Sequence, residues 1–114
     1  MTTSLLTLST DIEDGVKVVH VTGDLDLSTV PAFDAELEQS VGARHLVIEL
    51  ADCTFIDSSA LRALVRAQKR AIEEGGTLAI VAPSQPARRV LEVASLDRFV
   101  PVFGTVAEAV TSFA

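Results

Sequence analysis

The chain of 114 residues carries a net charge of −7 at pH 7, and 48% of its residues are apolar while 22% are charged. This length and composition predict one globular domain over residues 1–114, without linkers or low-complexity segments. The negative charge argues against nucleic acid or an anionic membrane surface as a direct partner, because both would repel the protein.

The cysteine and histidine content and the short apolar runs argue against disulfides, metal sites and membrane spans. A single Cys53 cannot form an internal disulfide, and His20 and His45 are too few for a metal-ligand cluster. We therefore expect no metal or cofactor, and we expect Cys53 to be a small core residue. The longest apolar runs reach only four or five residues, and the N-terminus lacks the basic and apolar regions of a signal peptide. The sequence therefore predicts a cytoplasmic protein.

The first part of the chain predicts a hairpin followed by a helix. Residues 4–12 and 16–22 alternate apolar and polar side chains, as half-buried strands do, and "EDG" at 13–15 is typical of a hairpin turn. The acidic segment "DLDLST", residues 24–29, is expected to be a loop. Beyond it, apolar residues at helical spacing, with a proline near the start, predict a helix over residues 30–41.

The rest of the chain alternates strands and helices. Residues 44–50 have a near-continuous apolar centre, which predicts an interior strand. Residues 58–74 predict a long helix that ends at a Gly-Gly pair, with Leu61, Leu64, Val65 and Ile72 on its apolar side. Residues 77–82 predict a buried strand, and residues 85–96 predict a helix capped by Ser84. Residues 99–103, which include Pro101, predict an edge strand. The last helix is predicted over residues 106–114, where Thr105 and Glu108 form a capping box at its start.

This order of elements predicts an α/β fold. We expect a central mixed, largely parallel sheet of about five strands with about four helices, in which the opening hairpin adds an antiparallel edge. In such sheets the loops at the carboxyl ends of the strands carry function. Two of those loops are "GDLDLST" and "TFIDSSA", so a functional site is expected there.

Enzyme chemistry finds little support in the residues. The sequence has no Gly-rich phosphate loop, nucleophile elbow or zinc-binding helix motif, and Ser58 has no histidine near it in the sequence to act as its base. A receiver domain could use Asp52 as phosphoacceptor, but that chemistry needs a lysine near the final strand, and no lysine follows Lys69. We therefore expect a protein that is not an enzyme.

The segment "FIDSSALRALVRAQKR" contains two features with two interpretations each. Asp57 or Ser58 can simply cap the helix, or the serine can carry regulated chemistry. The helix then presents a basic stripe, defined as Arg62, Arg66, Lys69 and Arg70, with no acidic residue between Ser58 and Ala71. The basic stripe is either a solvated helix face or a docking edge for another protein.

The combination of "VTGDLDLSTVPAF", "HLVIEL" followed by "FIDSSALRAL", and "GGTLAIVAPSQPARRVLEVASLDRFVPVF" resembles a STAS domain of the bacterial anti-sigma factor antagonist family. The resemblance covers nearly the whole chain and implies a STAS-like fold and a partner-switching role in transcription regulation and stress response. The unphosphorylated protein would bind an anti-sigma factor that is itself a serine kinase and so release a sigma factor. The kinase would phosphorylate Ser58, and a metal-dependent serine phosphatase would reverse the modification.

The same resemblance implies a partner-binding surface around the phosphoacceptor Ser58. Its expected members are Asp24, Asp26, Ser28, Asp57, Ser59, Ala60, Leu61 and Arg62. Ala60 stands where the family commonly has glycine, which would let a partner's backbone approach more closely. The alternative is a STAS scaffold or accessory subunit of a larger complex, such as a stressosome or lipid-transport assembly, in which Ser58 is only a cap.

Overall fold

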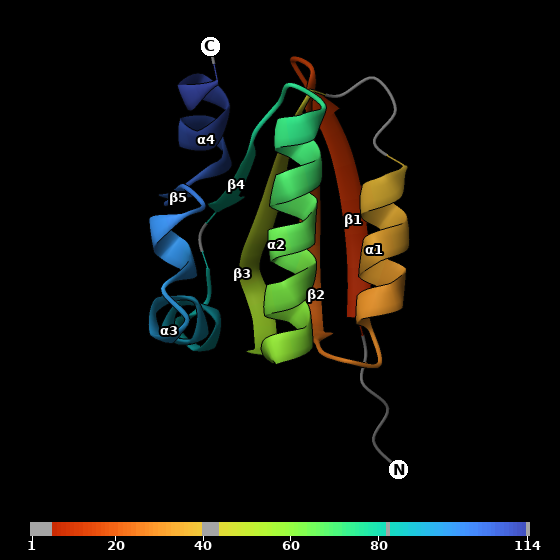
Figure 1. The fold of residues 1–114 in the computed structure, drawn as a ribbon, viewed down its shortest axis with the longest axis vertical. Helices are drawn as coiled ribbons and strands as arrows, with labels where there is room; N and C mark the ends of the chain where they lie inside the picture. The colour runs from red at the N-terminus through yellow and green to blue at the C-terminus, as the bar shows by residue number, and fades with distance from the viewer. Residues whose placement is uncertain (1–5, 40–43, 82, 114) are drawn as a thin grey trace.

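The computed structural model describes residues 6–39, 44–81 and 83–113. Five strands form one sheet in the order β1-β2-β3-β4-β5, with β1 antiparallel to β2 and the other neighbours parallel. The elements are β1 (Leu6–Glu13), β2 (Val16–Leu25), α1 (Val30–Glu38), β3 (His45–Ile56), α2 (Ser58–Glu73), β4 (Leu78–Val81), α3 (Gln85–Val93), the 3-10 helix η1 (Leu96–Arg98), β5 (Val102–Phe103) and α4 (Val106–Ser112) (Figure 1). The predicted α/β fold is confirmed.

The two faces of the sheet are covered by different helices. Buried residues of α1, α2 and α3, among them Phe33, Leu64 and Leu91, pack with one face of the sheet. Ala109 of α4 packs with Val18 and its neighbours on the opposite face. Figure 1 shows α1 and α2 side by side over the sheet, with α3 and α4 along the β4–β5 side. The sheet is thus covered by α1, α2 and α3 on one face and by α4 on the other.

Local sequence rules account for the connections. Asp14 and Gly15 both have positive φ, 51° and 77°, which suits the tight turn of the β1–β2 hairpin. Ser84 Oγ accepts a hydrogen bond from the N–H of Ala87 at 3.2 Å and so caps α3. Thr105 caps α4 in the same way through the N–H of Glu108 at 3.1 Å. The predicted turn and both predicted caps are confirmed.

Strands β2 and β3 are longer than predicted. The expected loop at 24–29 begins two residues later because β2 continues to Leu25, and β3 runs past residue 50 to Ile56. The two strands keep pairing through register shifts after His20 and Gly23, down to Leu25 opposite Ile56. Cys53, buried as expected, helps to hold this extension in the core.

Several helix and strand ends also differ from the predictions. Helix α1 ends at Glu38, and the predicted end at residue 41 lies outside the described residues. Helix α3 ends at Val93, because the chain turns through Ser95 with a φ of 58° into η1. The predicted edge strand shrinks to the two residues of β5. None of the helices within the described ranges is long and apolar enough to cross a bilayer.

Helix α2 buries only part of its predicted apolar side, because Leu61 and Leu64 pack with the core but Val65 and Ile72 do not. Leu64 is fully buried, but Val65 is 37% and Ile72 60% exposed. The residues that face the sheet are small: Ala60, Ala63, Ala67 and Ala71 are all buried. Small side chains let the helix approach the sheet closely, which leaves the larger Val65 and Ile72 on the outer side.

Candidate functional site

The carboxylate of Asp57 joins the start of α2 to the loop between β2 and α1. Its Oδ1 accepts a hydrogen bond from the N–H of Ala60 at 3.1 Å, which caps the helix. Its Oδ2 accepts a second hydrogen bond from the N–H of Leu27 at 3.2 Å. The N–H of Asp57 donates to the carbonyl oxygen of Leu25 at 3.3 Å. One residue therefore fixes the relative position of the two segments.

The β2–α1 loop, residues 26–29, is ordered by its own polar side chains. Asp26 Oδ1 accepts hydrogen bonds from the N–H of Ser28 at 3.0 Å, from Ser28 Oγ at 2.7 Å and from the N–H of Thr29 at 3.1 Å. The buried Thr29 donates through Oγ1 to the carbonyl oxygen of Asp24 at 2.9 Å. Such side chain to backbone bonds are typical of turns, and here they fix the shape of the loop.

Asp24 has a different role from Asp26. It lies within β2 rather than in a loop, and its Oδ1 accepts a hydrogen bond from Thr54 Oγ1 of the adjacent strand at 2.8 Å. This cross-strand bond supports the pairing of β2 and β3 beyond the register shifts. The carboxylate therefore contributes to the platform of the site as well as to its negative charge.

Ser58 differs from the neighbouring hydroxyl residues. It is the first residue of α2 and is exposed, and its hydroxyl makes no hydrogen bond within the described part of the chain. Asp57, one of the two predicted caps, performs the capping, so Ser58 is not needed for it. In contrast, Thr54 and Ser28 are bonded to carboxylates, and Ser59 is half-buried. Ser58 thus presents an exposed hydroxyl without a hydrogen-bond partner among the described residues.

The rest of the predicted surface is only partly exposed. Leu61 is half-buried and Arg62 is exposed on the next turn of α2. Ala60 is fully buried, with none of its surface exposed. Its methyl group packs in the core, so the side chain itself offers no exposed surface, and the place of Ala60 in partner binding stays a prediction. Ala60 lies within α2, and alanine is a better helix former than glycine, so the residue suits the helix.

Two apolar side chains beside Ser58 were not singled out in the sequence. Leu27 is 73% and Phe55 49% exposed, although both are large. Together with Asp26, Ser28 and Asp57 they line a shallow hollow of about 460 Å³. Exposed apolar groups with a polar rim are typical of protein–protein interfaces. For Leu27, the signal in the sequence is an apolar residue inside an acidic segment.

Two residues of the basic stripe form ion pairs within the described part of the protein, and two do not. Arg66 forms an ion pair with Asp34 of α1 at 2.9 Å, and Arg70 lies 3.7 Å from Glu38 of the same helix. These two arginines therefore bridge α2 to α1. Arg62 and Lys69 are exposed and have no ion pair among the described residues. Only part of the basic stripe is available to a partner.

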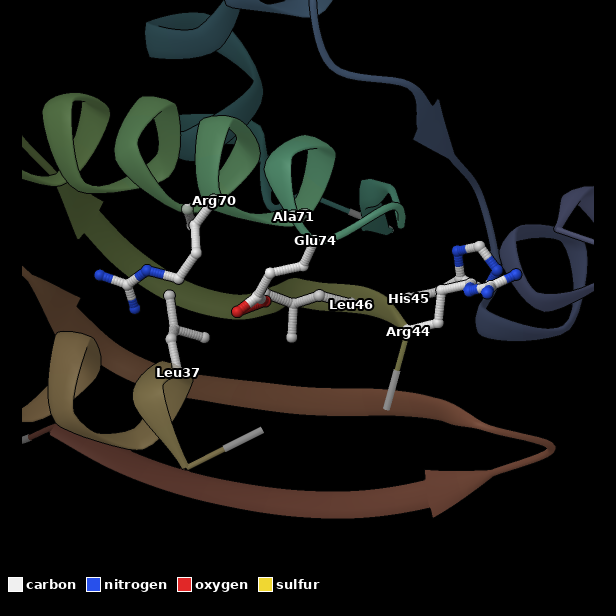
Figure 2. A pocket seen from close by; sticks show the side chains of 8 residues that line it. Leu37, Arg44, His45, Leu46, Arg70, Ala71 and Glu74 are labelled. Atoms are coloured by element: carbon white, nitrogen blue, oxygen red, sulfur yellow. The ribbon is translucent and has the colours of Figure 1, made fainter. Parts of the chain in front are cut away.

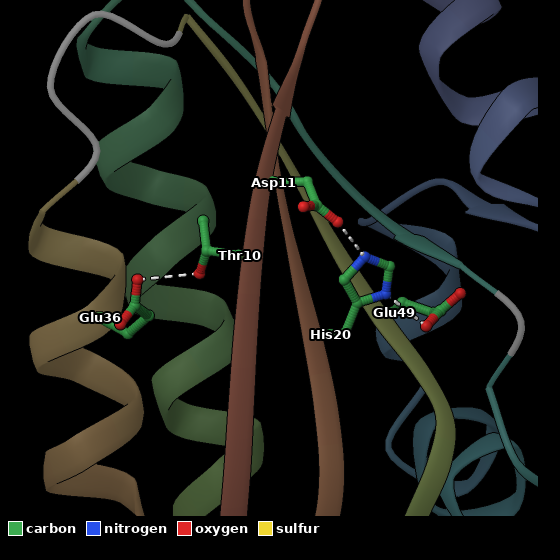
Figure 3. Close-up of polar contacts among 5 residues, drawn as sticks. All are labelled: Thr10, Asp11, His20, Glu36 and Glu49. Atoms are coloured by element: carbon green, nitrogen blue, oxygen red, sulfur yellow. Dashed lines mark hydrogen bonds and ion pairs between the residues drawn. The ribbon is translucent and has the colours of Figure 1, made fainter.

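A second cluster of titratable side chains, away from Ser58, centres on His20. His20 lies on the sheet between Glu49, at 2.6 Å from Nδ1, and Asp11, at 3.2 Å from Nε2 (Figure 3). The hydrogen bond with Glu49 raises the pKa of His20 above its usual value. In the residues that the structure describes, no group of three His, Cys, Asp or Glu side chains could hold a metal ion.

A cavity at the far end of α2 is too small for a ligand. It measures about 30 Å³ and lies between the last turns of α1 and α2, where Leu37 and Leu46 face Arg70 and Glu74 (Figure 2). Ligand pockets usually measure roughly 300 to 1,000 Å³. The volume suits about two water molecules, so this cavity offers no candidate substrate site.

The fold agrees with the resemblance seen in the sequence, and residues 7–109 match the family described as the STAS domain. The chain belongs to the STAS domain family. An anti-sigma F factor antagonist of Paenibacillus polymyxa is 27% identical to this STAS domain over 100 residues, which cover 85% of this chain and 86% of that protein. The anti-sigma-F factor antagonist RsfB of Mycobacterium tuberculosis is 27% identical over 108 residues, covering 93% of this chain and 88% of that protein.

A solved structure supports the same assignment. The crystal structure of an anti-sigma factor antagonist from Mycobacterium paratuberculosis is similar to this STAS domain, with a TM-score of 0.86 and 30% sequence identity. The similarity covers 96% of this chain and 94% of that one. The STAS domain therefore shares its fold, over almost its whole length, with a protein of that name.

Proposed function

We propose that the protein is an anti-sigma factor antagonist whose binding is switched by phosphorylation of Ser58. In its unphosphorylated form it binds an anti-sigma factor with serine-kinase activity and so releases a sigma factor. A metal-dependent serine phosphatase restores the binding form. The names of the relatives support the anti-sigma factor as the partner. The observation that carries the switch is that Ser58 is exposed and unbonded while Asp57 caps the helix.

The partner would dock on the surface around Ser58. Leu27 and Phe55 supply the apolar centre of this surface, and Asp26, Ser28 and Asp57 supply its polar rim. Desolvation of a neutral serine hydroxyl within such an interface costs little compared with desolvation of a charge. The surface thus favours a partner while Ser58 is unmodified.

A phosphate on Ser58 would be compatible with the fold. The side chain is solvated and lies at a helix N-terminus, where the dipole and free N–H groups favour negative charge. A phosphoserine adds about −1.5 to −2 charge at neutral pH. The added charge would stand beside the carboxylate of Asp57 on a surface whose rim is already acidic, so it acts on the complex rather than on the fold.

Within the complex, the same phosphate would be unfavourable. Burial of an unpaired anion against a partner costs several kcal/mol, which corresponds to a loss of affinity of roughly a hundredfold or more. We therefore expect release of the partner by desolvation and repulsion, without rearrangement of the STAS domain.

Two measurements test this function. Ser58→Asp is expected to reduce affinity for the anti-sigma factor by roughly a hundredfold or more, measured by calorimetry, with an unchanged circular dichroism spectrum. Ser9→Asp is the matched control, because this substitution adds the same charge. Ser9 is exposed on β1, away from the surface around Ser58. Tight binding by Ser58→Asp would contradict the proposal.

The second measurement locates the modification. Incubation with the kinase and ATP is expected to add one phosphate, at Ser58, as read by mass spectrometry of the digested protein. Thr54, whose hydroxyl is bonded to Asp24, and the half-buried Ser59 are expected to stay unmodified. Phosphate on either of those residues instead of Ser58 would refute the assignment.

A further inference from the structure

A groove between α2 and the segment after α3 begins one turn away from Ser58. Its residues are Leu61, Arg62, Val65 and Arg66 of α2, with Ala94 and Leu96 from the α3–η1 connection. We call it the α2–α3 groove. It has a volume of about 340 Å³ and is floored by apolar side chains, while two arginines lie on its α2 side. The hydrogen bond from Gln68 Nε2 to the carbonyl oxygen of Phe99 ties α2 to the residue that follows η1.

The groove continues the surface proposed for the partner. Leu61 and Arg62 follow Ser58 by three and four residues, and Val65 follows them by four and three, so these residues lie along one face of α2. Leu27 and Phe55 lie at one end of this face, and the groove lies along its length. A partner that contacts Ser58 can therefore reach the groove without leaving the helix. Interfaces of ordinary size cover about 800 Å² on each partner, more than one turn of helix provides.

The charge of this region is opposite to that of the rest of the protein. Residues 58–98 contain seven of the nine lysines and arginines but only four of the sixteen acidic residues. At the groove itself, Arg62 has no ion pair among the described residues, while Arg66 pairs with Asp34. A protein with a net charge of −7 thus presents an unpaired cation beside an apolar floor. The complementary ligand is acidic and carries an apolar side chain.

We propose that the α2–α3 groove binds an acidic amphipathic segment of the anti-sigma factor, an inference that rests on the proposed function. A large aliphatic or aromatic side chain of that segment lies between Val65 and Leu96, and a neighbouring carboxylate pairs with Arg62. The groove is shallow and open along α2, which suits a side chain protruding from a protein. Apolar anchoring determines how long the complex lasts, and the arginine accelerates its formation.

The test uses substitutions within the groove and matched substitutions outside it. Val65→Asp and Arg62→Glu are expected to weaken binding of the full-length protein to its anti-sigma factor by at least roughly tenfold, measured by calorimetry. Val93→Asp and Arg89→Glu are the controls, because both residues are exposed on α3 and neither lines the groove. We expect each control to change affinity by less than about twofold.

The salt dependence gives a second readout of the same proposal. Affinity of the unmodified chain is expected to fall as salt is raised, and Arg62→Glu is expected to flatten or reverse that dependence. Circular dichroism establishes that each variant is folded. If Val65→Asp proves unfolded, Arg62→Glu decides the outcome alone, because Arg62 is an exposed side chain.

The outcomes separate this inference from the function on which it rests. Binding that is lost in Ser58→Asp but kept within about twofold of the unmodified chain in both groove variants overturns the groove alone. If the unmodified chain binds none of the anti-sigma factors of its own organism, both the proposed function and the groove are overturned. Equal losses in the groove variants and in their controls also count against the groove, since they would reflect general electrostatics.

Discussion

Asp57 Oδ2 accepts a hydrogen bond from the backbone N–H of Leu27 at 3.2 Å, across 30 residues of sequence. The other oxygen of the same carboxylate caps α2. The exposed leucine and the exposed serine that follows Asp57 are therefore held in one arrangement by a single side chain. Removal of this carboxylate should affect both stability and recognition.

Asp57→Ala is expected to lower the free energy of unfolding by about 1 to 2 kcal/mol, because the cap and the bond to the loop are both lost. Asp57→Asn should cost less, since its amide oxygen still accepts a hydrogen bond from Ala60. Urea denaturation measures both. Ser58→Ala is the control and should lie within about 0.5 kcal/mol of the unmodified chain. Equal stabilities of Asp57→Ala and Ser58→Ala would contradict the assignment of the cap.

The His20 cluster predicts a pH dependence of stability. The hydrogen bond with Glu49 raises the pKa of His20 from 6.5, so the folded protein holds this proton more tightly than the unfolded chain does. The stabilisation is therefore fully present below the pKa that His20 has in the unfolded chain. It is lost as the pH rises through the pKa that His20 has in the folded protein. The difference in unfolding free energy between the unmodified chain and His20→Gln should shrink over that range.

Urea denaturation at a series of pH values checks this dependence. Glu49→Gln should remove most of it, because Glu49 makes the shorter contact with the imidazole. A difference between the unmodified chain and His20→Gln that stays constant or grows with pH would show that the cluster does not titrate in this way.

Neighbouring residues of α2 should respond very differently to the same kind of substitution. Leu64→Ala is expected to destabilise the protein by about 2 to 5 kcal/mol, because the side chain is fully buried and its loss leaves a cavity. Val65→Ala should change stability by only about 0.5 kcal/mol, because Val65 is partly exposed. Thermal unfolding compares the two. A larger loss for Val65 would mean that the helix is rotated from the orientation described.

The two glycines after α2 offer a second matched pair. A Cβ on Gly76 would lie 1.6 Å from the backbone oxygen of Arg44, so Gly76→Ala should cost more than about 3 kcal/mol or prevent folding. Gly75 has a φ of +82° and open space around it, so Gly75→Ala should cost only about 1 to 2 kcal/mol of backbone strain. Chemical denaturation distinguishes them, and the reverse order of stabilities would be inconsistent with the close approach of Gly76 to Arg44.

The fold could be predicted from the sequence where local chemistry decides it. Asp14-Gly15 requires positive φ, and Ser84 and Thr105 each offer a hydroxyl to a helix N-terminus. The extensions of β2 and β3 could not be predicted in this way. They depend on pairing between distant residues, such as the bond from Thr54 to Asp24, which no local pattern encodes.

The candidate site could likewise be predicted from the sequence only in part. The position of Ser58 at the start of a helix follows from the sequence, but the choice of Asp57 as the cap depends on the geometry of the β3–α2 junction. The predicted burial of Val65 and Ile72 is wrong, because periodicity alone favours these two residues whereas close packing on the sheet selects alanines. The pairs from Arg66 and Arg70 to α1 are likewise tertiary contacts.

The strands stand in the sheet in the same order as in the chain. During synthesis, each new strand can therefore pair with the strand made just before it. No later strand has to insert between two strands that are already paired. The segments around Ser58 come from β2, β3 and the start of α2, so they emerge before η1 and α4. The nascent protein thus presents Ser58 before the α2–α3 groove has been completed by Leu96.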